Sequence, residues 1–174
     1  MTYSRKNGKV WDTKENPNII VTFLSEGISR IKLNEPSSYN ALSSRNIKSL
    51  THIFTSLNND NKTKVIIIEG SGKGFSAGHD LKEMIATRKE TYYKKLFKQC
   101  SRMMMTLNQM PQPVIARVHG IATAAGCQLV AACDLAVAAE DARFATSGIN
   151  IGLFCSTPAV PVSRNIPRKK ALEL

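Results

Sequence analysis

The chain has 174 residues, with 24 Lys and Arg against 13 Asp and Glu, and a net charge of +11. This length suits one domain with a buried core. The content of 43% hydrophobic and 21% charged residues excludes disordered and collagen-like proteins. The apolar runs are short, such as residues 65–68, so no membrane span is expected.

The first half of the chain alternates strand-like and helix-like segments. Two β-branched segments, residues 19–24 and 28–33, are separated by Ser-Glu-Gly, which predicts a β-hairpin. Apolar residues recur with helical spacing in residues 43–57, which predicts an amphipathic helix. The apolar run 65–69 is typical of a strand buried on both faces, and the Gly- and Ser-rich segment 70–78 is expected to be a loop.

The second half continues the same alternation and predicts an α/β fold with a mainly parallel sheet. A helical stretch is expected from residue 81, continuing as a long helix to just before 111, followed by a strand at 114–118 and a helix at 124–133. A strand at 134–138, a strand–loop segment at 144–154 and the first turns of a helix at 168–174 are expected after them. Because the last helix has a start signal and no stop signal, we expect a fragment or a truncated isoform.

The four cysteines form no CxxC pair and have apolar neighbours. This pattern indicates buried thiols in a reducing compartment, with a disulfide or a zinc site as the alternative. No spacing typical of metal ligands occurs in the sequence, so no metal site is predicted.

Two glycine-containing loops each follow an apolar strand and precede a helix: the first glycine loop (residues 74–81) and the second glycine loop (residues 119–129). Neither has the pattern of a dinucleotide-binding or P-loop motif. Their small residues would let two backbone N–H groups converge on a developing oxyanion. The alternative interpretation is that these residues only permit close packing of helix on sheet.

Three motifs in these segments resemble those of the enoyl-CoA hydratase/isomerase (crotonase) family. They are Asn-Ala-Leu at residues 40–42, Phe-Ser-Ala-Gly-His-Asp-Leu-Lys-Glu-Met at 75–84, and Ala-Ala-Gly-Cys-Gln-Leu at 124–129 with Cys133-Asp134 after it. The resemblance implies a crotonase-like spiral of ββα units over a core domain at 19–174. This core would lack the family's C-terminal helical region and would follow a flexible N-terminal segment at 1–18.

The resemblance also implies a site for an acyl-CoA thioester, in which coenzyme A is part of the substrate and no other cofactor is needed. The backbone N–H groups of His79 and Ala125 would be the oxyanion donors. Family members usually have glycine at the second of these positions, so the Ala125 methyl group requires a negative φ there. The residues implied to contact coenzyme A are Tyr39, Ala41, Ala77, His79, Asp80, Leu81 and Lys82.

Both catalytic glutamates of the hydratases are absent at the matching positions, which hold Gln128 and Gly148. A carboxamide does not exchange a proton near neutral pH, and glycine has no side chain to do so. The resemblance therefore implies an acyl-CoA-binding protein of fatty-acid metabolism whose hydratase activity is weak or absent. Whether it is an enzyme stays open at this point.

Two alternatives remain: an RNA-binding protein with this fold, and a non-functional truncated isoform. Basic residues gather at 88–102, but aromatic residues are not interleaved with them as in stacking platforms, so nucleic acid is not the expected partner. The resemblance implies a mitochondrial location, although residues 1–18 are not a clear presequence. It also implies a homotrimer or a dimer of trimers for full-length members.

Overall fold

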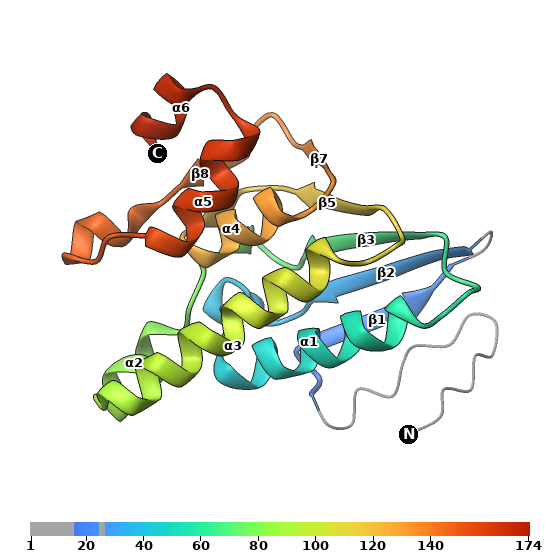
Figure 1. Cartoon of the computed structure of the whole chain (residues 1–174), viewed down its shortest axis with the longest axis horizontal. Helices are drawn as coiled ribbons and strands as arrows, with labels where there is room; N and C mark the ends of the chain where they lie inside the picture. Colours follow the sequence, from blue (N-terminus) through green and yellow to red (C-terminus); the bar gives the residue numbers. More distant parts are fainter. Residues whose placement is uncertain (1–15, 25–26) are drawn as a thin grey trace.

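A five-stranded sheet forms the larger layer of the molecule, with strands in the order β1–β2–β3–β5–β7 (Figure 1). The computed structural model describes residues 16–24 and 27–174. The strands are β1 (Ile19–Phe23), β2 (Ile28–Leu33), β3 (Val65–Gly70), β5 (Val114–Val118) and β7 (Leu135–Ala138). The first two strands pair antiparallel and the others pair parallel, which confirms the predicted hairpin and the mainly parallel sheet.

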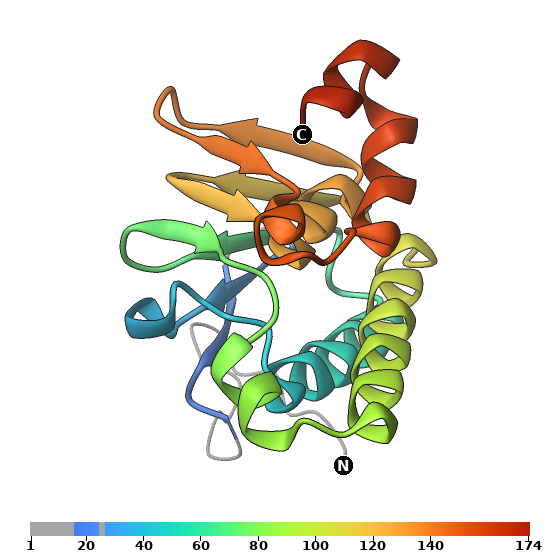
Figure 2. The same cartoon turned by 90° about the vertical axis from the view of Figure 1, so that its left-hand side faces the viewer.

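A second sheet contains the short parallel strands β4 (Gly74–Ser76), β6 (Ile121–Thr123) and β8 (Arg143–Ala145). In each of three repeats, a strand of the larger sheet is followed by a strand of the smaller sheet and then by helical structure (Figure 2). This confirms the expected spiral of ββα units. The prediction of an uninterrupted loop at 70–78 is wrong, because three residues are too few to show strand periodicity.

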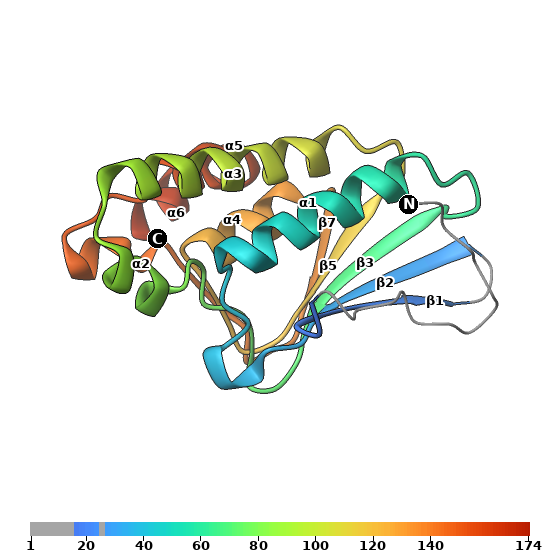
Figure 3. The ribbon, with the colours of Figure 1, turned by 90° about the horizontal axis from the view of Figure 1, so that it is seen from below.

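Two long helices, α1 (Ser44–Asn58) and α3 (Glu90–Asn108), lie on the same face of the larger sheet (Figure 3). The predicted helical stretch from residue 81 is interrupted, because Arg88 ends α2 (Leu81–Thr87) in the left-handed conformation, at φ 39°. The remaining helices are α4 (Ala125–Ala132), α5 (Ser156–Asn165) and α6 (Arg168–Glu173). The sequence analysis did not predict α5, which contains Pro158 and Pro161.

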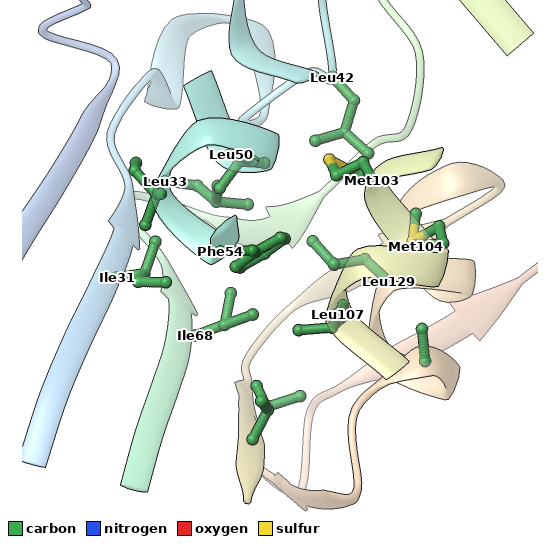
Figure 4. Packing of buried hydrophobic residues seen from close by; sticks show 14 of the residues in the cluster. Ile31, Leu33, Leu42, Leu50, Phe54, Ile68, Met103, Met104, Leu107 and Leu129 are labelled. Carbon is green, nitrogen blue, oxygen red and sulfur yellow. The ribbon is translucent and has the colours of Figure 1, made fainter. Parts of the chain in front are cut away.

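The hydrophobic core lies between the larger sheet and the two long helices (Figure 4). The Phe54 ring is fully buried there, and the buried Met103 and Met104 side chains of α3 belong to the same cluster. The residues of the core include Ile31, Leu33 and Ile68 from the sheet, Leu50 and Phe54 from α1, and Met103, Met104 and Leu107 from α3. The amphipathic pattern of both helices is thus explained by packing on the sheet.

Most of the segment expected to be flexible, residues 1–18, lies outside the described residues. Within the described part, Asn16 is buried, and its amide nitrogen donates to Asn46 Oδ1 at 3.0 Å and Ser49 Oγ at 2.9 Å. The predicted domain start at residue 19 stays a prediction.

The buried side chain of Asn40 connects the loop before α1 to the junction of the two sheets. Its amide nitrogen donates to the carbonyl oxygens of Ser71 at 2.8 Å and Gly74 at 2.9 Å, and its Oδ1 accepts from the Glu35 N–H at 2.9 Å. Asn40 itself has φ 55°, which asparagine tolerates better than most residues. These bonds fix the chain that leads into the first glycine loop.

We expect Asn40→Ala to lower the free energy of unfolding by about 3 kcal/mol, because it leaves several buried backbone groups without partners. Urea unfolding followed by circular dichroism measures the change. Asn59→Ala is the matched control, since the Asn59 amide donates to the Thr55 carbonyl oxygen at an exposed site. A loss for Asn40→Ala no larger than that of the control would contradict this role.

Candidate functional site

A pocket of about 440 Å³ lies where the first glycine loop, the start of α4 and the 3-10 helix η4 (Ser147–Ile151) meet. Figures 1 and 3 both place α2 and η4 at the same end of the molecule. The lining residues are Ala77, His79, Leu81, Met84, Phe97, Ala124, Ala125, Ser147, Gly148, Asn150, Ile151, Leu153, Phe154, Cys155, Ser156, Thr157 and Pro158. A second pocket of about 520 Å³, between α4, β7, α5 and α6, contains none of the predicted site residues.

The first glycine loop reaches the pocket through a turn at Gly78, where φ is +87°. A Cβ atom at Gly78 would lie 3.0 Å from the Ala125 nitrogen, so the backbones of the two glycine loops are in direct contact there. The Leu42 N–H donates to the Gly78 carbonyl oxygen at 2.7 Å. The loop position is therefore fixed from both sides.

The second glycine loop turns into α4 at Ala124, which has φ 48° and ψ −121°. The required negative φ at Ala125 is met, because this residue begins the helix and the positive φ falls one residue earlier. The first N–H groups of a helix have no intrahelical acceptor. A Cβ atom at Gly126 would lie 2.2 Å from the Ser76 carbonyl oxygen, so α4 packs directly on β4.

The structure brings three of the seven residues predicted to contact coenzyme A into the wall of the pocket. Ala77, His79 and Leu81 line it, and the exposed Lys82 follows on α2. Tyr39 does not line the pocket, but its carbonyl oxygen accepts from the Ala77 N–H at 2.9 Å. Ala41 is buried in the same loop as Tyr39.

Two nearby carboxylates have structural partners. The Asp80 carboxylate caps α2 by accepting from the N–H groups of Lys82 at 2.9 Å and Glu83 at 3.1 Å. Asp134 Oδ2 accepts from the Val114 N–H at 2.8 Å, as expected for a residue that joins α4 to β7. Neither side chain is among those that line the pocket.

The two positions predicted for missing glutamates differ in their surroundings. Gly148 lines the pocket, whereas the buried Gln128 does not. Gln128 Oε1 accepts a long hydrogen bond of 3.4 Å from the Thr157 hydroxyl. A Cβ atom at Gly148 would lie 2.5 Å from the Leu153 carbonyl oxygen and 2.6 Å from Cys155 Sγ, so a side chain at Gly148 requires its neighbours to move.

The imidazole of His79 forms part of the pocket wall and contacts the Phe97 ring edge-on, with 5.4 Å between ring centroids. Burial lowers the pKa of His79 below its usual value of 6.5, and this effect exceeds the opposing effects of the Leu42 backbone and the Glu83 charge. Its Nδ1 atom is buried without a hydrogen-bond partner. The ring is therefore favoured in its neutral form.

Apart from Gly148, sequence reasoning missed the wall formed by η4 and the segment that leads into α5, including Asn150, Leu153, Phe154 and Cys155. The repeat itself was a usable signal. In the third ββα repeat, the segment after β8 takes the place that the segments after β4 and β6 take in the first two repeats, and those segments form the glycine loops. All four cysteines are free thiols, but the prediction that they are buried is confirmed for Cys100 and Cys127 and wrong for Cys133 and Cys155, which are half-buried. Among residues 16–24 and 27–174, no His, Cys, Asp and Glu cluster could hold a metal ion, and no helix has the length and apolarity to cross a membrane.

Comparison with known families agrees with this geometry. The family model described as Enoyl-CoA hydratase/isomerase matches residues 24–174. The chain belongs to the enoyl-CoA hydratase/isomerase family. The resemblance noted from the three motifs is thereby confirmed.

Similar proteins include enoyl-CoA hydratase domain-containing protein 3, mitochondrial, from Xenopus laevis and Homo sapiens. The Xenopus laevis protein is 51% identical over 148 residues, which are 85% of this chain and 50% of that protein. The Homo sapiens protein is 50% identical over 149 residues, which are 86% and 49% of the two chains. The chain thus spans about half the length of these curated relatives.

Solved structures confirm the crotonase-like fold. The crystal structure of human enoyl Coenzyme A hydratase domain-containing protein 3 matches with a TM-score of 0.85 and 48% identity, over 90% of this chain and 61% of that chain. The crystal structure of enoyl-CoA hydratase from Mycobacterium smegmatis matches with a TM-score of 0.88 and 52% identity, over 91% of this chain and 62% of that chain.

We expect Ala124→Gly to raise the free energy of unfolding by about 1 kcal/mol, because glycine removes the penalty of a positive φ at a residue with a Cβ atom. Chemical denaturation measures the change. Ala122→Gly is the control and should be destabilising, since Ala122 is buried in β6 with no positive φ. Destabilisation by Ala124→Gly would show that the Ala124 backbone is not strained.

The lowered pKa of His79 predicts a pH dependence of stability. Below about pH 6.5 the unfolded chain binds more protons at this residue than the folded chain does, so stability is lost as the pH falls. We expect His79→Gln to reduce the decline in unfolding free energy between about pH 7 and 5, measured by urea titration. Asn59→Ala, a substitution without a titratable group at an exposed site outside the pocket, should keep the wild-type decline; equal pH profiles for all three proteins would refute the assignment.

Proposed function

We propose that this chain binds acyl-CoA thioesters and holds the thioester carbonyl oxygen with the backbone N–H groups of His79 and Ala125. The observation that carries the proposal is the contact of the two glycine loops at one pocket. Both residues line this pocket, and the residue before His79 approaches the Ala125 nitrogen directly. Two N–H donors in a fixed frame stabilise an oxygen that gains negative charge.

The position of Ala125 strengthens this interaction. It is the first residue of α4, and the N-terminus of a helix carries a partial positive charge. An enolate or a tetrahedral oxyanion at this point would gain from both the hydrogen bonds and the helix dipole. The site is thus suited to the activation of a thioester carbonyl.

The residues that line the pocket include no carboxylate for proton transfer. Gln128 is an amide that lies outside the pocket lining, and Gly148 has no side chain. The nearby Asp80 carboxylate is used to cap α2. We therefore propose that hydration of an enoyl-CoA is weak or absent, since each general acid–base group typically contributes about 10²–10⁴-fold.

The remaining walls suit an uncharged acyl group at one end and coenzyme A at the other. Apolar side chains of Met84, Phe97, Leu153 and Phe154 line the pocket. The exposed Lys82 lies beside Leu81 at the start of α2, where its ammonium group can approach a phosphate. We assign coenzyme A to this side as part of the substrate, with no separate cofactor.

Location and assembly form part of the proposal. The relatives named mitochondrial support a mitochondrial location. The homotrimer or dimer of trimers is proposed for full-length members only, and the edge strand β7, whose Leu135 and Val137 residues are 61% and 64% exposed, is the surface that supports it. Apolar side chains of this size on an open edge are typical of an interaction surface.

Calorimetric titration with butyryl-CoA tests the binding proposal, with free butyrate as the control ligand. We expect saturable binding of butyryl-CoA at one site per chain and no binding of butyrate. In parallel, hydration of crotonyl-CoA is measured by the decrease of its enoyl absorbance, and we expect this decrease to be negligible. Absence of acyl-CoA binding would refute the proposed site. Rapid hydration would refute the proposal that the chain lacks groups for proton transfer to the substrate.

We expect Lys82→Ala to weaken butyryl-CoA binding about threefold, because an exposed ion pair contributes roughly 0.2–1 kcal/mol. Added salt should reduce the difference between wild type and variant. Lys64→Ala is the matched control, since the exposed Lys64 precedes β3 at the opposite end of that strand from the pocket. Equal affinities of the two variants at low salt would place the phosphates elsewhere.

A further inference from the structure

Three of the four thiols of the chain are made less acidic by burial, and the fourth lies at the candidate site. Burial raises the pKa of Cys100 to about 12, that of Cys127 to about 11 and that of Cys133 to about 12. Thiols of this kind react slowly because the thiolate is the nucleophile. Cys155 is half-buried and is the thiol whose residue lines the candidate site together with His79 and Ala125.

The sulfur of Cys155 occupies a defined place in this pocket. It lies 2.6 Å from where a Cβ atom of Gly148 would be, so it fills space that a side chain at the matching glutamate position would need. Cys155 is also the N-cap of α5, a helix of ten residues, and its side chain makes no capping hydrogen bond. The partial positive charge of a helix N-terminus stabilises negative charge that develops on such an atom.

We propose that Cys155 accepts the acyl group of a bound acyl-CoA and forms an acyl-cysteine thioester. This inference rests on the proposed function, since it requires the thioester carbonyl to bind at the His79 and Ala125 N–H groups. The observation behind it is that one pocket contains two oxyanion donors, a free thiol and no carboxylate among its lining residues. The pocket therefore holds a nucleophile in the place where a hydratase would hold a proton-transfer group.

The chemistry needs no further reactant. Cys155 Sγ attacks the carbonyl carbon, the carbonyl oxygen takes the negative charge at the two N–H groups, and the bond to the coenzyme A sulfur then breaks. The thiol proton passes to the departing coenzyme A thiolate. One thioester replaces another, so the step is close to balanced in free energy, and covalent catalysis of this type relies on the oxyanion donors for its rate.

The test is intact-mass spectrometry of the folded chain after incubation with butyryl-CoA. We expect a mass increase equal to one butyryl group per chain, release of an equal amount of free coenzyme A, and loss of the adduct on treatment with neutral hydroxylamine. Peptide mapping should place the group on Cys155. Cys155→Ala should abolish the adduct, whereas Cys133→Ala, which removes a thiol outside the pocket lining, should retain it.

Two further measurements separate this inference from the proposed function. Calorimetry should show that Cys155→Ala still binds butyryl-CoA; binding by the wild type without an adduct overturns acyl transfer and leaves the proposed function intact. Absence of binding overturns both. The urea-unfolded chain, which has lost the two oxyanion donors, should form no butyryl adduct, and equal labelling of all four cysteines in the folded chain would also overturn the inference.

Crotonyl-CoA distinguishes acyl transfer from addition of the thiol to the double bond. Acyl transfer adds only a crotonyl group and releases coenzyme A. An adduct that retains the whole crotonyl-CoA, with none formed from butyryl-CoA, would overturn acyl transfer and assign conjugate addition to Cys155 instead.

Discussion

The close contact between the first glycine loop and the start of α4 is the constraint on which the rest of the site depends. Gly126 packs so tightly on Ser76, and Gly78 so tightly on Ala125, that neither position has room for a side chain. The chain therefore has to turn through positive φ at Gly78 and at Ala124. The same contact directs two backbone N–H groups to one pocket, so the packing of the fold and the binding of a carbonyl oxygen have a common cause.

Much of this arrangement could be predicted from the sequence. The strands of the larger sheet and the helix α1 follow directly from hydrophobic patterning, because each of these elements buries one or both faces. The three motifs also identify the loops that meet at the pocket. What could not be predicted were β4 and β6, whose three residues each take their conformation from neighbouring strands rather than from any local pattern; β8 was expected as the strand part of the segment 144–154.

The site shows the same division. His79 and Ala125 could be placed because they lie in two of the motifs that resemble those of the enoyl-CoA hydratase/isomerase family. The close approach of Cys155 to Gly148 could not be predicted, because it depends on how η4 folds back after β8. This fold-back leaves no periodic signal in the sequence. The restriction at Gly148 is one of space, since φ there is not positive, and only the structure shows which atoms occupy that space.

The ββα connectivity has a mechanical consequence for ligand selection. Because each repeat contributes a strand to both sheets, the sheets cannot slide past each other without stretching three short connections. The wall that we propose to face a thioester is thus held by both sheets, whereas the opposite wall projects Ile151 and Phe154, which are 62% and 75% exposed. Under the proposed function, preference for the thioester head and preference for the acyl tail belong to separate parts of the chain, and substitutions of Ile151 and Phe154 are expected to alter the second while leaving the first unchanged.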